Sequence, residues 1–199
     1  MKLYSYVVKV DTGFAPNPFW EYCTLACCKP NIRKSASAGD WIVGTGAVSN
    51  VGSIKLVYAM KVTEKLTFEE YSQDKRFQCK VPKKGQMEER GDNIYHPDKN
   101  GDLIQCRSYH IEKDSKRDLS SGFVLISDHY FYFGKKGVLI PDDFKVIIKS
   151  GPGHKCNFDS RIVSDFVAWI ESNFSKGMQE YPFDYKERLF NKTDMCSCQ

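Results

Sequence analysis

Long apolar runs are missing from this sequence. No stretch approaches the roughly 20 apolar residues that a helix needs to cross a bilayer. Residues 1–10 carry polar side chains throughout and lack the continuous apolar core of a signal peptide. From these two absences we expect a cytoplasmic protein that has no contact with a membrane.

Densely and regularly spaced cysteines are also missing. The eight cysteines are spread too thinly over 199 residues for a small secreted scaffold, so we expect reduced thiols. Cys23, Cys27 and Cys28 do not have the spacing of a zinc knuckle or a thioredoxin-like motif, and we predict no metal site and no cofactor. Packing is the favoured role of these thiols. A cation at Lys29 would nevertheless favour a thiolate at Cys28, which leaves a reactive Cys28 as the alternative.

A long basic tract is the third absence. The chain has 29 basic and 25 acidic residues, which leave a net charge of +4. This balance permits contact with phosphates but does not establish nucleic-acid binding. Internal repeats and low-complexity segments are lacking too. Since a core of this length can bury about 70% of the unfolded surface, one domain without stabilising disulfides is expected.

Short apolar segments rich in β-branched and aromatic residues are what the sequence does contain. They predict strands over residues 3–10, 39–46, 55–62, 122–127, 128–134 and 138–141. Helices are predicted over 21–28, after a Thr67 N-cap, and over 159–174, where apolar residues share one face. The fold class is therefore α+β, a single domain with a mixed sheet covered by a few helices.

Residues 78–118 form the least regular segment and are rich in Gly, Asp, Asn and Lys. They could be a disordered insertion. They could also be functional, because Tyr95-His96 and Tyr109-His110 place aromatic and titratable groups in a long loop. We divide the chain into a domain at residues 1–175, which contains this insertion, and a peripheral tail at 176–199 that ends in a cysteine-rich segment.

The first candidate binding segment runs from Asp11 to Trp20. Its prolines could hold Asp11, Asn17 and an aromatic ring in a fixed relation that suits a planar, hydrogen-bonding ligand. An Asx/proline turn without any ligand is the alternative, because Asn and Pro favour turns on their own.

Two histidines follow apolar strands or glycine turns. His129, next to Asp128, could serve as a general acid or base at the end of a strand. The alternative is a turn capped by Asp128 and a local hydrogen bond for His129. Gly151 to Phe158 contains His154 and Lys155 before the best helix, so it could receive a phosphate. It lacks Walker spacing, and a plain glycine turn is the alternative reading.

Aromatic residues from Tyr130 to Phe133 could stack on bases. Aromatic side chains in a strand usually include one row that faces the core, so half of the cluster is expected to be packing. Backbone contacts to a nucleic acid could come from basic residues dispersed along the chain, namely Arg33, Lys34, Lys83, Lys84, Lys135 and Lys136.

Five short strings, taken in order, resemble the nucleotide modification associated domain 2 family. They are Asp11-Thr12-Gly13-Phe14-Ala15-Pro16-Asn17-Pro18, Cys27-Cys28-Lys29-Pro30, Gly39-Asp40-Trp41-Ile42-Val43-Gly44, Ser127-Asp128-His129-Tyr130 and Gly153-His154-Lys155. The resemblance spans about residues 1–175 and implies an association with phage and bacterial systems for modified DNA bases. The Gly39-Asp40 turn and its strand are also similar to an element of PUA-like modified-base readers, which implies a strongly curved sheet.

Three functions follow as hypotheses. The leading one is a protein that binds a nucleotide or a nucleic acid with a modified base. The second is an enzyme acting on a nucleotide or nucleobase, and the third is a component of a defence or counter-defence system that binds another protein. The expected acid/base residues are His129, Asp128, His154 and Asp11, with Cys28 as a less favoured nucleophile. The expected ligand-binding residues are Asn17, Phe19, Trp20, Cys28, Lys29, Arg33, Trp41, Tyr130, Tyr132, Lys155 and Asn157.

Overall fold

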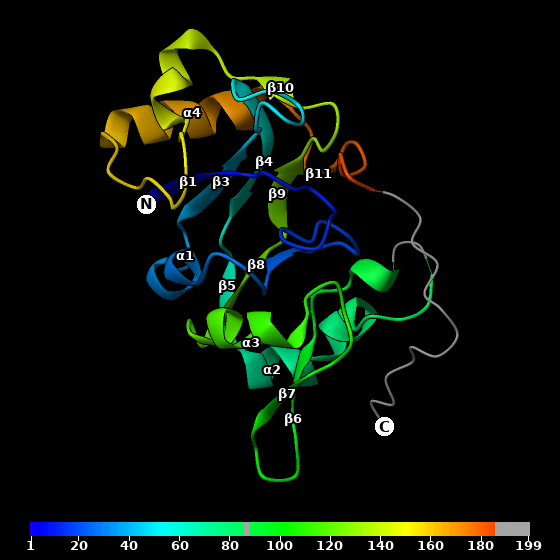
Figure 1. Cartoon of the computed structure of the whole chain (residues 1–199). Helices are drawn as coiled ribbons and strands as arrows, with labels where there is room; N and C mark the ends of the chain where they lie inside the picture. The colour runs from blue at the N-terminus through cyan, green and yellow to red at the C-terminus, as the bar shows by residue number, and fades with distance from the viewer. Residues whose placement is uncertain (86–87, 186–199) are drawn as a thin grey trace.

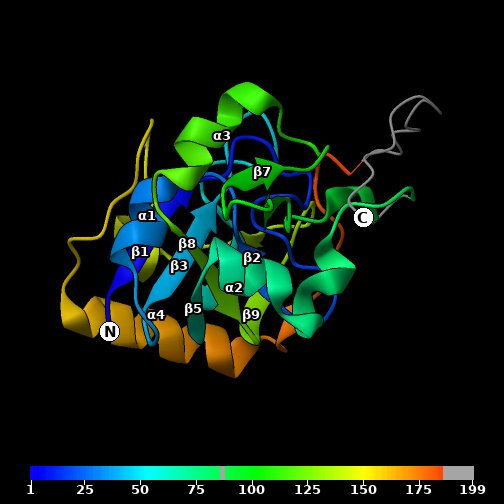
Figure 2. The same cartoon turned by 90° about the horizontal axis from the view of Figure 1, so that it is seen from below.

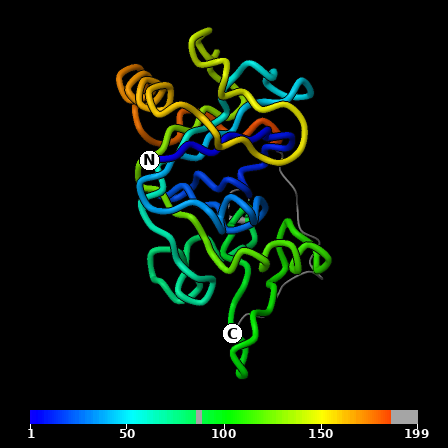
Figure 3. Tube along the Cα trace, turned by 90° about the vertical axis from the view of Figure 1, so that its left-hand side faces the viewer, coloured from blue at the N-terminus to red at the C-terminus, as the bar shows by residue number. Residues whose placement is uncertain are grey.

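A computed structural model describes residues 1–85 and 88–185 of the chain, and its elements are stacked in layers (Figure 1). The layers run from a long helix, through a large mixed sheet and a smaller sheet, to a group of short helices. A hairpin projects from the end opposite the long helix (Figure 3). The predicted α+β class and the mixed sheet are confirmed.

The large sheet, called sheet A, contains six strands in the order β1-β3-β4-β9-β11, with β10 paired to β4. The outer pairs β1/β3 and β9/β11 are parallel, and the inner pairs β3/β4 and β4/β9 are antiparallel. The strands are β1 (Leu3–Val7), β3 (Trp41–Thr45), β4 (Lys55–Lys61), β9 (His129–Tyr132), β10 (Val138–Leu139) and β11 (Gly177–Met178).

One face of sheet A is covered by helix α4 (Ser160–Asn173) and the 3-10 helix η3 (Asp142–Ile147). Trp41 and Phe131 of the sheet pack there against Phe166 and Ile170 of the helix. Asp159 is the N-cap of α4, and its side chain accepts a hydrogen bond from the backbone N–H of Arg161 at 2.8 Å. Because successive side chains of a strand point to opposite faces of the sheet, every second residue of these strands faces α4.

The other face of sheet A packs against the smaller sheet, called sheet B. Tyr4, Tyr6, Tyr58 and Tyr132 contribute to this buried core. Sheet B has the antiparallel order β2-β8-β5. Its strands, together with the short helix after β2, are β2 (Cys23–Leu25), α1 (Pro30–Ser35), β5 (Glu64–Thr67) and β8 (Phe123–Ser127).

A third core lies on the far side of sheet B and includes much of the segment 78–118. Phe14 and Cys27 pack there with Tyr71, Phe77 and Tyr95. The described part of this segment contains short helices and strands joined by loops. The elements of this layer are α2 (Phe68–Gln73), η1 (Lys75–Lys80), η2 (Glu88–Arg90), β6 (Tyr95–Pro97), β7 (Leu103–Gln105) and α3 (Glu112–Leu119), and β6 and β7 form the projecting hairpin.

The helix predicted over residues 21–28 is wrong, since that segment contains strand β2. Trp20 and Glu21 have φ angles of 58° and 66°, which an α-helix does not accept. Hydrogen bonds to Asn17 on one side and to β8 on the other hold Thr24 in an extended conformation. A strand partner about 100 residues away thus overrides the local pattern.

Residues after 176 begin with β11, which pairs with β9 and adds an edge to sheet A. The backbone N–H of Phe183 donates to Asp11 Oδ2 at 3.1 Å, which holds this segment against the first loop. The cysteine-rich end at Cys196 and Cys198 lies outside the described residues. Within the described ranges, none of the helices has the length and apolar content that a membrane span requires.

Candidate active site

Cys28 lies on a sharp turn between strand β2 and helix α1. Cys28 and Lys29 both have positive φ angles, 59° and 43°, a left-handed conformation that is unfavourable for residues with side chains. Pro30 then begins the helix with its fixed φ. Strained turns of this kind, between a strand and a helix, present a nucleophile away from the sheet. The side chain of Cys28 is half-buried, whereas the neighbouring Cys27 is fully buried.

The Cys28 sulfur lies 3.4 Å from Nε2 of His110. His110 belongs to the loop between β7 and α3, and only 9% of its side chain is exposed. The Phe14 ring packs against the imidazole with a centroid separation of 4.7 Å. The backbone carbonyl of His110 accepts hydrogen bonds from the Gln105 amide at 2.8 Å and the Ser108 hydroxyl at 3.1 Å. His110 is thus held by hydrogen bonds to its backbone carbonyl and by the packing of Phe14 on its ring.

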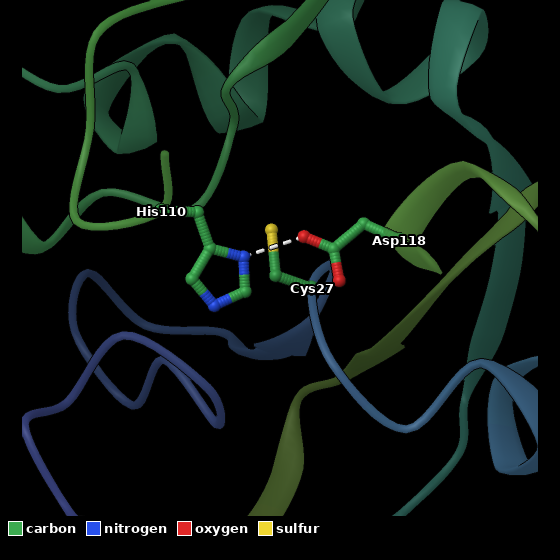
Figure 4. Close-up of side chains that lie close together, drawn as sticks. All are labelled: Cys27, His110 and Asp118. Carbon is green, nitrogen blue, oxygen red and sulfur yellow. Dashed lines mark hydrogen bonds and ion pairs between the residues drawn. The ribbon is translucent and has the colours of Figure 1, made fainter. Parts of the chain in front are cut away.

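Asp118, in the last turn of α3, joins the two. Its Oδ2 atom lies 2.5 Å from Nδ1 of His110, so the two side chains point toward each other (Figure 4). The same atom accepts a hydrogen bond from the Tyr95 hydroxyl at 3.1 Å, and Oδ1 accepts one from the backbone N–H of Cys28 at 2.8 Å. The buried carboxylate therefore orients both the imidazole and the backbone of the cysteine.

Arg33 connects the backbone of Cys28 to the backbone of Asp118. Its guanidinium donates to the backbone carbonyl of Cys28 at 2.7 Å and to that of Asp118 at 2.6 Å. It also donates to the Ser121 hydroxyl and the Phe123 carbonyl, at 2.5 and 2.6 Å. Helices α1 and α3 lie side by side as a result (Figure 2). Arg33 is fully buried, so these internal acceptors replace solvent as its partners.

The charges of this group follow from its hydrogen bonds. Burial lowers the pKa of His110, but hydrogen bonds to Asp118 and to the Cys28 sulfur, with their charges, raise it more, to about 9. Burial raises the pKa of Asp118, and the bond to His110 and the donors from Cys28 and Tyr95 lower it below its ordinary value. At neutral pH the pair is therefore an imidazolium and a carboxylate. The imidazolium can donate from Nε2 to the Cys28 sulfur.

Cys27 stands beside this pair and raises the question of a metal. Its sulfur, a ring nitrogen of His110 and an oxygen of Asp118 lie within 4.8 Å of one another (Figure 4). Two ligands of one tetrahedral zinc ion are about 3.3 Å apart, since each bond is about 2.0–2.2 Å long. The 2.5 Å between Nδ1 and Oδ2 is instead a hydrogen-bond distance. Burial also raises the pKa of Cys27 well above its usual value, so these side chains form a charged hydrogen-bonded pair with a thiol beside it.

Two basic side chains pack on tyrosines of β1, in sheet A. Lys29 Nζ lies 4.3 Å from the centre of the Tyr6 ring. His154 packs against Tyr4, with ring centres 5.8 Å apart. The two basic residues are more than 100 positions apart in the sequence. Lys29, which was expected to bind a ligand, and His154, which was expected to act as an acid or base, therefore pack on neighbouring tyrosines, and Lys29 directly follows Cys28 in the chain.

Asp11 and Asn17 both have internal partners. The Tyr132 hydroxyl donates to Asp11 Oδ1, and burial is the main cause that raises the pKa of Asp11. The Asn17 side chain donates to the Gly13 and Arg90 carbonyls at 3.0 and 2.6 Å. Its oxygen accepts from the Lys80 ammonium at 2.6 Å. These contacts hold the loop from residue 11 to 20 in shape.

The aromatic residues expected to bind a ligand lie mainly in the core. Phe19 is buried beside Trp20, with ring centres 5.7 Å apart, and the Lys80 ammonium lies 5.5 Å from the centre of the Trp20 ring. The Tyr130 hydroxyl donates to the Pro18 carbonyl at 2.9 Å. Tyr132 is fully buried. Of the loop from residue 11 to 20, Phe14 is the side chain that touches the imidazole of the site.

His129 lies on the opposite face of sheet A from Cys28. Its Nε2 atom is 3.0 Å from Glu171 Oε1 of α4, and its ring packs at 5.6 Å against Trp41. Because successive residues of β9 alternate in direction, His129 and Trp41 face α4 while Tyr130 and Tyr132 face the other core. Asp128 is exposed beside the strand end.

Lys155 and Asn157 lie near the edge of sheet A. The backbone of Lys155 pairs with Ser5, and its Nζ atom donates to the Val146 carbonyl at 2.9 Å. Asn157 is exposed. Of this segment, His154 is the residue that the charge of Lys29 reaches.

The sequence interpretation omitted His110 and Asp118 as acid/base residues. The only local signal was the pair Tyr109-His110 in a long loop. Asp118 carried no local signal of a functional role, because most residues of its helix, α3, are charged. Their relation to Cys28 depends on contacts across 82 and 90 residues, which no local motif reports.

The fold and the site define a class, an α+β protein in which a cysteine on a strained turn is linked to a histidine and an aspartate. The family model described as nucleotide modification associated domain 2 matches residues 1–189, so the chain belongs to that family. The match extends beyond the span of residues 1–175 inferred from the sequence strings. Comparisons with curated proteins and with solved structures found no match, and a PUA-like relationship is not shown.

Proposed function

We propose that the protein is an enzyme that acts on a nucleotide, with Cys28 as its nucleophile. The observation that carries this proposal is the hydrogen-bonded chain from the Cys28 sulfur to His110 and on to Asp118. Nucleophile, base and orienting carboxylate in this order are the recurring parts of covalent catalysis. Membership of a family described as associated with nucleotide modification supports a nucleotide or a modified base as the class of substrate.

The chemistry that suits these groups best is acyl transfer from an amide or ester carried by the nucleotide. The Cys28 thiolate adds to the carbonyl carbon, and the bond from that carbon to the leaving nitrogen or oxygen breaks as a thioester forms. The His110 imidazolium gives its Nε2 proton to the leaving group. Water then attacks the thioester, neutral His110 takes a proton from that water, and the acid product leaves with the thiolate and imidazolium restored.

The supporting residues give this assignment its geometry. Asp118 fixes the Nδ1 proton of His110 and leaves Nε2 directed at the sulfur. Arg33 ties the Cys28 and Asp118 backbones together, so the distance between nucleophile and carboxylate does not depend on a flexible loop. A cysteine in a left-handed conformation is the kind of strain found where a side chain must be aimed.

The test is a mass-spectrometric screen of nucleotides that bear amide or ester groups on the base or sugar. The wild-type protein is expected to release the acyl group and to carry a transient acyl adduct on Cys28. Cys28→Ser should yield neither product nor adduct. Cys156→Ser, which removes an exposed cysteine outside the site, is the matched control and should react as the wild type does. Turnover that survives in Cys28→Ser would contradict the proposal.

A binding function without turnover, as expected from the sequence, would use the same region. It predicts that a nucleotide or modified base binds wild type and Cys28→Ser alike and that no substrate changes mass with either protein. Calorimetry on the two proteins, run beside the screen, separates the two functions.

A further inference from the structure

The residue after Cys28 carries an ammonium group that lies among aromatic rings. Lys29 is half-buried, and its Nζ atom is 4.3 Å from the centre of the buried Tyr6 ring. The Tyr6 hydroxyl is already bonded to Tyr58 at 2.8 Å, so the ring offers Lys29 its π face. This contact is weaker than an ion pair and leaves the donors of the ammonium available to a ligand.

Two charged groups, one of each sign, act on Lys29 within the described part of the chain. Burial lowers the pKa of Lys29, and the charges that act on it come from the Cys28 sulfur and the Arg117 guanidinium. His154 has the same character, since burial and the charge of Lys29 lower its pKa. Among the described residues, no carboxylate forms an ion pair with Lys29 or His154. Two basic groups from distant segments thus pack on neighbouring tyrosines of β1, and neither has a carboxylate partner within the described residues.

Such an arrangement is unfavourable for the protein alone and favourable for an anionic ligand. A desolvated ammonium is destabilised unless a negative group approaches it, and hydrogen bonds from charged donors to phosphate are among the strong ones. A neutral imidazole at His154 adds an N–H donor without further repulsion. The methylene groups of Lys29 alone could cover the Tyr6 ring. Covering the ring therefore does not explain why the ammonium group lies near a second basic residue, His154.

We propose that Lys29 and His154 form a subsite that binds the phosphate of the nucleotide substrate and so holds the reacting group beside Cys28. The identity of the ligand as a nucleotide rests on the proposed function. The phosphate belongs either to a free nucleotide or to a polynucleotide backbone, and the two share the same recognition chemistry. Binding at this subsite needs the two cations and does not need the cysteine thiol.

The test is calorimetric titration of Cys28→Ser, which binds without reacting. The ligands are a nucleoside 5′-monophosphate, the matched nucleoside, inorganic phosphate and a short single-stranded oligodeoxynucleotide. We expect the monophosphate or the oligonucleotide to bind at least about tenfold more tightly than the nucleoside, because a charged hydrogen bond is added. Whichever of the two binds more tightly identifies the source of the phosphate.

Second substitutions in the same background locate the site. Lys29→Gln and His154→Gln are each expected to remove most of the preference for phosphate. Lys99→Gln, which deletes an exposed lysine in the turn between β6 and β7, is the matched control and should keep it. Circular dichroism confirms that each variant is folded.

Equal binding of nucleoside and monophosphate would overturn the subsite, as would a preference that survives in Lys29→Gln. Both results leave the reactivity of Cys28 untouched and so do not bear on the proposed function. Conversely, phosphate binding that depends on Lys29 would support the subsite even if Cys28 proved to carry out no reaction.

Discussion

Replacing Asp118 by Asn removes a charge from the centre of the site and leaves its shape nearly unchanged. An amide at this position can still accept the hydrogen bond from the backbone N–H of Cys28 through its oxygen. It cannot stabilise an imidazolium at His110 as a carboxylate does. We therefore expect Asp118→Asn to convert His110 to a neutral ring at pH 7.

The magnitude follows from the pKa of His110, which rises from 6.5 to about 9 in the folded protein. At 1.36 kcal/mol for each pKa unit, the imidazolium is favoured by about 3 kcal/mol. Most of the side chain is buried, so solvent screens little of this interaction. Without the carboxylate, burial is the dominant influence, and the pKa of His110 should fall below 7.

Linkage gives a second readout. The folded-state pKa of His110 lies above its unfolded value, so the stabilisation is complete below pH 6.5 and is lost as the pH rises through 9. The difference in unfolding free energy between wild type and Asp118→Asn should therefore shrink by up to about 3 kcal/mol between pH 6.5 and pH 9.5.

The assay is an NMR titration of the four histidines, with His110 assigned from the resonance that disappears in His110→Gln. Wild type should show one histidine that titrates near pH 9, and Asp118→Asn should show that resonance moved below pH 7. A wild-type spectrum in which all four histidines titrate below pH 7 would refute the reasoning, because Asp118 and the Cys28 sulfur would then not hold an imidazolium.

Two further predictions concern buried cations. Arg33→Met should lower the unfolding free energy by about 3 kcal/mol or more in urea titrations, because the carbonyls of Cys28 and Asp118 lose a buried donor; Arg161→Met, at an exposed position, should change it by less than about 0.5 kcal/mol, and equal effects would contradict the bridging role of Arg33. The Lys80 ammonium donates to three backbone carbonyls and the Asn17 side chain, and burial lowers the pKa of Lys80 to about 8. Because the unfolded chain binds more protons between pH 8 and 10.5, the unfolding free energy of wild type should rise by about 3 kcal/mol relative to Lys80→Met over that range, and a constant difference would refute the shifted pKa.

Much of the fold could be predicted because its signals are local. The apolar strand after Gly39-Asp40, the strand from Lys55 and the amphipathic helix capped by Asp159 all occur where their patterns place them. Strands β3 and β4, which are neighbours in the sequence, pair antiparallel in sheet A. Strand β2 could not be predicted, since its three residues are held extended by pairing with β8 and, at Thr24, by hydrogen bonds to Asn17.

The candidate site also contains residues that a local sequence signal marks and residues that no local signal marks. Cys28 and Lys29 stood out because a thiol beside a cation is a local feature. His110 and Asp118 could not be joined to Cys28, since β6, β7 and α3 form a layer whose position depends on a core built by Phe14, Cys27 and Tyr95. The charged composition that suggested a disordered insertion includes buried residues of this layer, such as Lys80, Asp92 and Asp118.

The reactivity of Cys28 tests the central claim most directly. Alkylation by iodoacetamide at pH 7, followed for each cysteine by peptide mass spectrometry, compares Cys28 with the exposed Cys156 in one sample. We expect Cys28 to be alkylated faster than Cys156 in the wild-type protein. In His110→Ala, the alkylation rate of Cys28 should no longer exceed that of Cys156. A Cys28 that reacts no faster than Cys156, or whose rate is unchanged in His110→Ala, would contradict the assignment of Cys28, His110 and Asp118 as a catalytic group.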